Sequence, residues 1–218
     1  MQAVHLVQPL VAFSLSIFHI LAVNLPNTIT VSRLFLTAAF IVFVTKESTW
    51  SYFIALILFV VAAASDFLDG WLARKMNLVT PLGKLLDPLA DKILVCSAFV
   101  FLSAKGVCPV WITTLILGRE FLVTGLRQIA IEAGQVLAAD RLGKWKTTFQ
   151  LVYLISALLW LTLETMETMS PLLSFFHHIT QPFAEGAWLL PVSLFLAVAL
   201  TVISGWNYLW SSRYLLRG

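Results

Sequence analysis

Two aspartates and an arginine share one face of a predicted helix near residue 70. Asp66, Asp69, Gly70, Ala73 and Arg74 follow the i, i+3, i+4, i+7, i+8 spacing that places residues on one side of a helix. That face combines two carboxylates, two small residues and a guanidinium. Because carboxylates ligate hard cations and a guanidinium pairs with phosphate, the pattern predicts a site that binds both.

A second helix that carries carboxylates is predicted directly after the first. Thr80 is a favourable helix cap and Pro81 suits the first helical position, so we expect a helix to begin here. Gly83, Asp87 and Asp91 then follow at i, i+4 and i+8 and share a face. The short connection makes the two helices antiparallel neighbours, and we expect their four carboxylates to face one another.

Four facing carboxylates are unfavourable unless a counterion neutralises them. An aspartate within a membrane span costs about 3 kcal/mol, and two like charges about 4 Å apart repel by roughly 4 kcal/mol at an effective dielectric of about 20. Ligation by carboxylates alone suits Mg²⁺ or Mn²⁺, and four carboxylates suffice for two ions with shared ligands. Zinc would prefer histidine or cysteine ligands.

Small residues on the same two faces indicate room for a bulky ligand. Gly70, Ala73 and Gly83 carry little or no side chain where a ligand would approach the helix backbone. Arg74 can present a planar fork to a phosphate held by the metal ions. The pattern therefore predicts a pocket as well as an ion site.

The elements that carry these residues are predicted to be membrane-spanning helices of an all-α protein. The 218 residues are 60% hydrophobic and 11% charged, whereas charged residues make up roughly a quarter of a soluble domain. The net charge of +3, without a basic run interleaved with aromatics, gives no indication of nucleic-acid binding. The segment 164–188 is expected to be a loop. Six apolar stretches are the predicted spans: 31–45, 52–66, 85–104, 110–131, 149–163 and 189–209.

Basic residues concentrate on one side of these six predicted spans, and only Lys46 and Lys105 fall on the other. Since lysine and arginine in short loops mark the cytoplasmic face, we expect both termini and the aspartates there. Residues 1–30 are interpreted as a cytoplasmic or interfacial segment, with an interfacial helix as one alternative, and residues 31–218 as one six-helix domain. The basic residues on the cytoplasmic side are Arg33, Arg74, Lys75, Lys84, Lys92, Arg119, Arg127, Arg141, Lys144, Lys146, Arg213 and Arg217.

The two aspartate motifs together resemble the signature of the CDP-alcohol phosphatidyltransferases. Every signature position is filled in Asp66-x-x-Asp69-Gly70-x-x-Ala73-Arg74 and Gly83-x-x-x-Asp87-x-x-x-Asp91. The expected layout of six spans with cytoplasmic termini also matches this family. The resemblance implies a homodimeric enzyme of the inner membrane, in which an alcohol attacks the β-phosphorus of a CDP-linked lipid such as CDP-diacylglycerol and CMP leaves.

The resemblance also implies roles for individual residues. Asp66, Asp69 and Asp87 would hold one divalent ion, and Asp66, Asp87 and Asp91 a second. Asp91 would also be the general base that accepts the proton of the attacking hydroxyl. Contacts to the CDP-lipid would come from Gly70, Arg74 and Thr80, with Gly83 leaving room, and from Ile29, Thr30, Val31 and Ser32.

Four cations form the candidate binding site for the acceptor alcohol. Arg119 and Arg127 lie two turns apart on one predicted span, and Lys144 and Lys146 enter the next. The surrounding segments, together with residues 26–33, are similar to those of bacterial family members whose acceptor is glycerol 3-phosphate. Four cations suit such an anionic acceptor. Inositol phosphate would need them as well, whereas serine or inositol would need them less.

Several alternatives remain open. Arg119 would have only a structural role if it merely pairs with Glu120 or Asp140, and the lysines would then set orientation or bind anionic headgroups. An intramembrane prenyltransferase also binds a metal diphosphate through aspartate pairs, although that fold usually has more spans. A cation transporter would place its carboxylates near the middle of the membrane, whereas these lie toward the cytoplasmic boundary.

Overall fold

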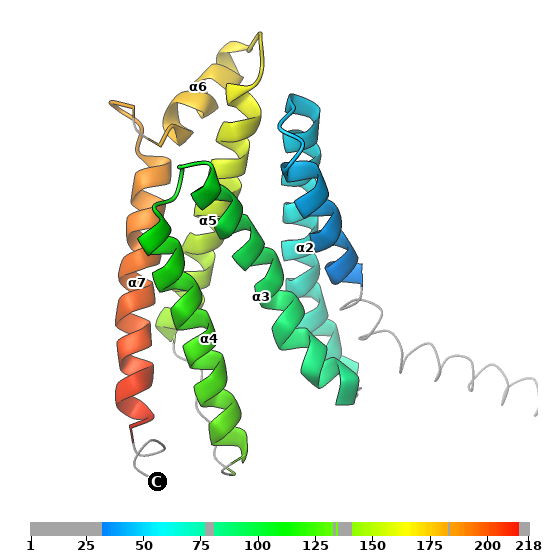
Figure 1. The fold of residues 1–218 in the computed structure, drawn as a ribbon, viewed down its shortest axis with the longest axis vertical. Coiled ribbons are helices and arrows are strands. Elements are labelled where there is room, and N and C mark those ends of the chain that lie inside the picture. The colour runs from blue at the N-terminus through cyan, green and yellow to red at the C-terminus, as the bar shows by residue number, and fades with distance from the viewer. Residues whose placement is uncertain (1–31, 77–80, 133, 135–140, 183, 214–218) are drawn as a thin grey trace, which may run out of the picture.

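A computed structural model of the chain describes residues 32–76, 81–132, 134, 141–182 and 184–213, with the side chains of residues 66–91, 132 and 141 left out. Within these ranges every regular element is an α-helix, as the sequence predicted (Figure 1). A first helix, Ser32–Val44, is followed by α2 (Thr49–Met76), α3 (Pro81–Ala104), α4 (Val110–Glu132), α5 (Arg141–Glu164), α6 (Pro171–Thr180) and α7 (Leu189–Ser211).

Each of the six predicted apolar spans coincides with a helix, but the segment 164–188 is not simply a loop. It contains α6, which begins at Pro171 after Ser170, whose hydroxyl accepts a hydrogen bond from the Leu173 amide at 3.4 Å. A serine cap followed by proline is a favourable start for a helix. The search for long apolar runs missed α6 because it has only ten residues.

A second difference concerns the start of α5. This helix begins at Arg141, whereas the predicted span begins at residue 149. The first two turns of α5 carry Lys144, Lys146 and Thr147, so they are too polar to be recognised as part of a span. Both lysines therefore lie on a helix, which fixes the direction of each side chain.

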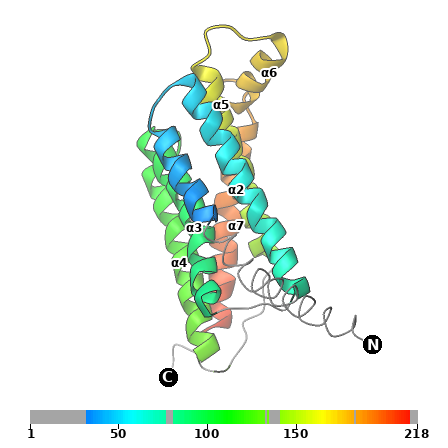
Figure 2. The same cartoon turned by 90° about the vertical axis from the view of Figure 1, so that its right-hand side faces the viewer.

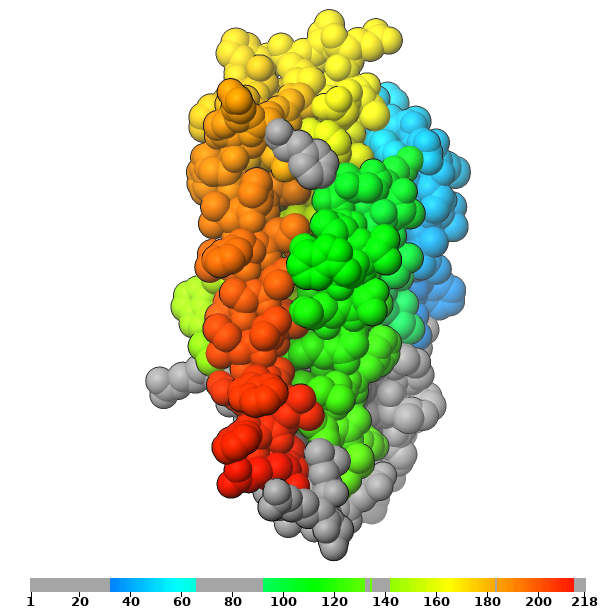
Figure 3. Space-filling view, turned by 60° about the vertical axis from the view of Figure 1, so that its left-hand side comes forward, coloured from blue at the N-terminus to red at the C-terminus, as the bar shows by residue number. Residues whose placement is uncertain are grey.

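Successive long helices run in opposite directions along one axis. The connections between them therefore alternate between the two ends of the molecule. The C-terminal ends of α2, α4 and α7 and the N-terminal end of α3 lie at the lower end in Figures 1 and 2, and α6 lies across the upper end. Figure 3 shows α7 alongside α4 over much of their length, in agreement with the packing between these helices. Residues far apart in the sequence therefore meet at the lower end.

The interior is apolar and is centred on α2, α3 and α5. Phe40 packs against Phe59 with ring centroids 5.7 Å apart, and Phe99 stacks on Tyr153 at 5.9 Å. The Tyr153 hydroxyl donates a hydrogen bond to the Val107 carbonyl at 3.2 Å. All four aromatic rings are buried, so these contacts hold the helices that position the site.

The surface of the described helices is also strongly apolar. Large side chains exposed on it include Phe35, Trp50, Trp111, Phe121, Phe195 and Trp206. Apolar surface on this scale is typical of a protein that contacts lipid. Two helices, Leu142–Glu164 within α5 and Leu189–Ser211, are long and apolar enough to cross a membrane; shorter apolar helices are Ser32–Val44, Thr49–Ser65 and Lys92–Ala104.

Candidate functional site

The four predicted metal-binding aspartates lie on two continuous helices. Asp66 and Asp69 are in the last turns of α2, and Asp87 and Asp91 are in the first turns of α3. The helical spacing assumed from the sequence is therefore confirmed, and the two helix ends lie at the same end of the molecule. The directions of these four side chains lie outside the described residues, so the ion site stays a prediction.

The predicted CDP-lipid residues are only partly within the described chain. Gly70 and Arg74 are on α2, Gly83 is on α3, and α3 begins at Pro81 as expected. Ser32 is exposed at the start of the first helix. Ile29, Thr30, Val31 and Thr80 lie outside the described residues.

A polar cavity of about 160 Å³ lies between α3, α4 and α5. It contains Arg119, Arg127 and Lys146, three of the four residues predicted to bind the acceptor. Lys144 is exposed and does not line this cavity, because residues two apart on a helix point to nearly opposite sides. The full lining is Lys92, Arg119, Glu120, Val123, Thr124, Arg127, Gly143, Lys146 and Thr147.

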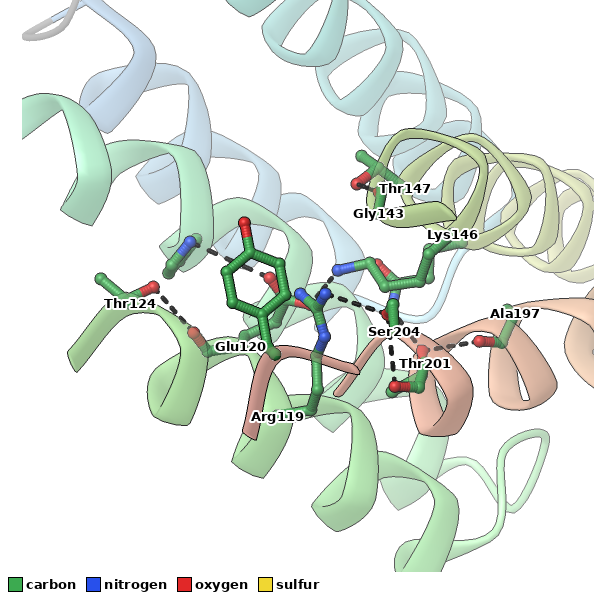
Figure 4. A network of polar contacts seen from close by, with 12 residues as sticks. Arg119, Glu120, Thr124, Gly143, Lys146, Thr147, Ala197, Thr201 and Ser204 are labelled. Carbon is green, nitrogen blue, oxygen red and sulfur yellow. Dashed lines mark hydrogen bonds and ion pairs between the residues drawn. The ribbon is translucent and has the colours of Figure 1, made fainter. Parts of the chain in front are cut away.

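Glu120 is the centre of charge in this cavity, with three cations around its carboxylate. Lys146 donates a hydrogen bond to Oε1, Arg119 Nη1 lies 3.5 Å from the same oxygen, and Lys92 Nζ lies 3.9 Å from Oε2 (Figure 4). The alternative that Arg119 pairs with Glu120 is thus confirmed as a contact. Four cations and one carboxylate still leave three positive charges in excess in the described lining, which suits an anionic ligand.

Lys92 connects this cavity to the predicted catalytic aspartate. It follows Asp91 directly on α3, and its side chain lines the cavity. Successive residues on a helix are separated by a rise of about 1.5 Å, so the cavity begins within a turn of Asp91. From the sequence, Lys92 was assigned only to the cytoplasmic side; its place in the cavity was not predicted, although its position beside Asp91 was a usable signal.

Helix α7 contributes a further set of contacts to the two arginines. Arg119 Nη2 donates to Ser204 Oγ at 3.0 Å, as Figure 4 shows. Arg127 donates to the Tyr208 hydroxyl from Nη2 at 2.5 Å and from Nε at 3.2 Å. These pairs are separated by 85 and 81 residues, and neither belongs to a local sequence motif. Sequence reasoning therefore missed Ser204 and Tyr208.

Comparison with known proteins agrees with the geometry of the two helices and the cavity. A family model described as CDP-alcohol phosphatidyltransferase matches residues 23–202. The chain belongs to this family. The matched residues include the four aspartates and the whole cavity lining.

Individual members of the family are similar over most of the chain. A Bacillus subtilis protein named CDP-diacylglycerol–glycerol-3-phosphate 3-phosphatidyltransferase is 39% identical, with 85% of this chain and 93% of the relative covered. A Cereibacter sphaeroides protein of the same name is 33% identical with the same coverage. A Pseudomonas fluorescens protein of that name is 40% identical over 61% of this chain and 70% of its own length.

Proposed function

We propose that this enzyme transfers the phosphatidyl group of CDP-diacylglycerol to a hydroxyl of glycerol 3-phosphate, with phosphatidylglycerophosphate and CMP as products. The observation that carries the proposal is the cationic cavity whose lining residue Lys92 adjoins Asp91. The names of the bacterial relatives support the same donor and acceptor.

The charge of the cavity favours a phosphorylated acceptor over a neutral one. A phosphate monoester carries close to two negative charges near neutral pH and accepts several hydrogen bonds. Arg119, Arg127, Lys92 and Lys146 supply such donors, and only Glu120 opposes their charge within the described lining. Serine and inositol would leave this excess of positive charge without a partner.

The carboxylates fit a pair of divalent cations. All four potential donors are carboxylate oxygens, which Mg²⁺ and Mn²⁺ prefer, and α2 and α3 are helical without a break through the residues concerned. Asp66, Asp69 and Asp87 would hold one ion, and Asp66, Asp87 and Asp91 would hold the other. When bound, the ions neutralise the diphosphate and stabilise the charge that develops on the departing CMP.

The reaction requires one proton transfer and one exchange of a phosphorus–oxygen bond. Asp91 accepts the proton of the attacking hydroxyl, whose oxygen forms a bond to the β-phosphorus. The bond from this phosphorus to the bridging oxygen breaks, and CMP leaves with the electron pair. Arg74 and Gly70 hold the CDP moiety, and Arg119, Arg127 and Lys146 hold the acceptor phosphate.

The enzyme spans the bacterial inner membrane six times, has both termini in the cytoplasm and acts as a homodimer. The two helices long enough to cross, the apolar outer surface and the bacterial relatives support this location. The helix ends that carry the aspartates lie at one end of the molecule, which supports a site facing the cytoplasm (Figure 1). The basic residues of the cavity support the same orientation, because lysine and arginine mark the cytoplasmic side.

The experiment uses the purified full chain with CDP-diacylglycerol and Mn²⁺, and offers glycerol 3-phosphate, serine, inositol and inositol phosphate in turn. We expect CMP only with glycerol 3-phosphate and no CMP with the Asp91→Asn variant, while the Glu185→Gln variant, changed at an exposed acid outside the site, stays active. Activity with serine alone would refute the acceptor. Release of pyrophosphate would favour a prenyltransferase, and ion flux in liposomes without CDP-lipid would favour a transporter.

A further inference from the structure

One face of α7 is built to contact the two arginines of α4. Ser204, Gly205 and Tyr208 lie at i, i+1 and i+4 on this helix, and all three are buried. A Cβ at Gly205 would come within 3.1 Å of Arg119 Cγ, so the absence of a side chain there allows the arginine stem to pass close to the helix.

Tyr208 contacts both guanidinium groups with a single side chain. Its hydroxyl accepts hydrogen bonds from Nε and Nη2 of Arg127, which fixes one edge of that guanidinium. Its ring centroid lies 5.3 Å from Arg127 Cζ and 5.8 Å from Arg119 Cζ, within the range of cation–π attraction. The two arginines are eight residues apart on α4, about 12 Å along the axis, so this ring brings together two groups that the helix alone would keep apart.

The partners that α7 offers are neutral. A serine or tyrosine hydroxyl can orient a guanidinium and still leave its positive charge available, whereas a carboxylate would orient it and cancel the charge. Among the described residues, Arg127 forms no ion pair, and its hydrogen-bond acceptor is the Tyr208 hydroxyl. Lys146 and Arg119 differ, because Glu120 partly neutralises both of them. Arg127 is therefore the cation best prepared for an incoming anion, and Arg119 has in Ser204 a second, neutral partner that orients it.

We propose that Tyr208 is a positioning residue which, together with Ser204, holds Arg127 and Arg119 in the orientation that binds the phosphate of the acceptor. This proposal rests on the proposed function, since it identifies the acceptor as the ligand of these arginines. Tyr208 acts through the arginines and does not itself contact the reacting atoms.

The test compares Tyr208→Phe with Tyr153→Phe in the purified full chain. Both substitutions remove one buried hydroxyl and keep the ring, but the Tyr153 hydroxyl bonds to a backbone carbonyl far from the cavity. We expect Tyr208→Phe to raise the KM for glycerol 3-phosphate about tenfold, the size expected for a lost hydrogen bond to a charged group. The KM for CDP-diacylglycerol and kcat should stay within about twofold, because ground-state binding of one substrate is affected. Tyr153→Phe should leave both KM values unchanged.

Two outcomes would overturn the positioning role while leaving the proposed function intact. One is an unchanged KM for glycerol 3-phosphate in Tyr208→Phe; the other is an equal rise of both KM values with a fall in kcat, which a general structural defect would produce. A separate measurement, calorimetric binding of inorganic phosphate to wild type and Tyr208→Phe, needs no turnover. If glycerol 3-phosphate is not a substrate but phosphate binding weakens about tenfold in the variant, the proposed acceptor fails and the positioning role stands. Unchanged phosphate binding would refute the positioning role.

Discussion

Replacing Glu120 by glutamine tests whether one carboxylate holds the cationic cavity together. Glutamine has nearly the same shape, so the substitution removes the charge and little else. The Glu120 side chain is 15% exposed and that of Lys146 only 3%, so most of this pair is shielded from water. Lys92 and Arg119 would lose their shared partner at the same time.

The expected cost follows from the distances. Across 3.5 Å and 3.9 Å, each attraction amounts to about 4 to 5 kcal/mol at an effective dielectric of about 20, before the cost of removing the charges from water is subtracted. Removing one partner of a buried pair costs about 3 to 5 kcal/mol in practice. Because the cavity is polar and Glu120 is partly exposed, we expect the lower value, about 3 kcal/mol in the free energy of unfolding.

The assay is denaturant unfolding of the purified protein in detergent, with Glu164→Gln as the matched control. Glu164 also contacts a side chain that can carry positive charge, with its Oε2 2.7 Å from His177 Nε2, but the Glu164 side chain is 52% exposed. The same substitution should therefore cost less than about 1 kcal/mol there. Inorganic phosphate should stabilise Glu120→Gln more than wild type, because the anion replaces the missing negative charge. The reasoning is refuted if the two variants lose equal stability, or if phosphate stabilises wild type and Glu120→Gln equally.

Three further predictions concern other parts of the molecule. In a kinetic assay, Gly205→Ala should raise the KM for the acceptor several-fold, because the new Cβ would displace Arg119. The control Gly125→Ala lies on α4, where a Cβ meets nothing within 4 Å, and should leave this KM unchanged. Burial raises the pKa of the Cys108 thiol and so lowers its thiolate fraction at pH 8, which makes it unreactive. Mass spectrometry should find Cys108 unmodified by maleimide in the folded protein and modified after unfolding. Chelation of divalent cations should abolish CMP release, Mg²⁺ or Mn²⁺ should restore it, and a chelated enzyme that stays fully active would contradict the ion site.

The helices were predictable wherever a long apolar run marks them. All six predicted spans coincide with helices, because apolar runs of about fifteen to twenty-two residues leave few alternatives to a helix in lipid. The beginning of α5 was not recognised, since Lys144 and Lys146 interrupt the apolar pattern. The helix α6 was not recognised either, because it is short; the sequence Ser170-Pro171 was the local signal that marked its start.

The candidate site was predictable only where its residues follow a helical repeat. Arg119 and Arg127 could be paired from their spacing on one helix, and Lys146 from its place at the start of the next. The central role of Glu120 was not predicted, because it depends on how Lys92 from α3 and Lys146 from α5 approach α4. Contacts between separate helices depend on packing geometry, and this geometry produces no periodic pattern of residues in the sequence.

The position of Ser204 and Tyr208 on α7 has a consequence for how the protein is made. Of the helices that contact the two arginines, α7 is the last to leave the ribosome, well after the arginines themselves have been synthesised. Until α7 packs beside α4, Arg127 cannot form its hydrogen bonds to Tyr208, and Arg119 cannot form its hydrogen bond to Ser204. A nascent chain therefore carries the cations early but acquires their final arrangement only when α7 has been inserted.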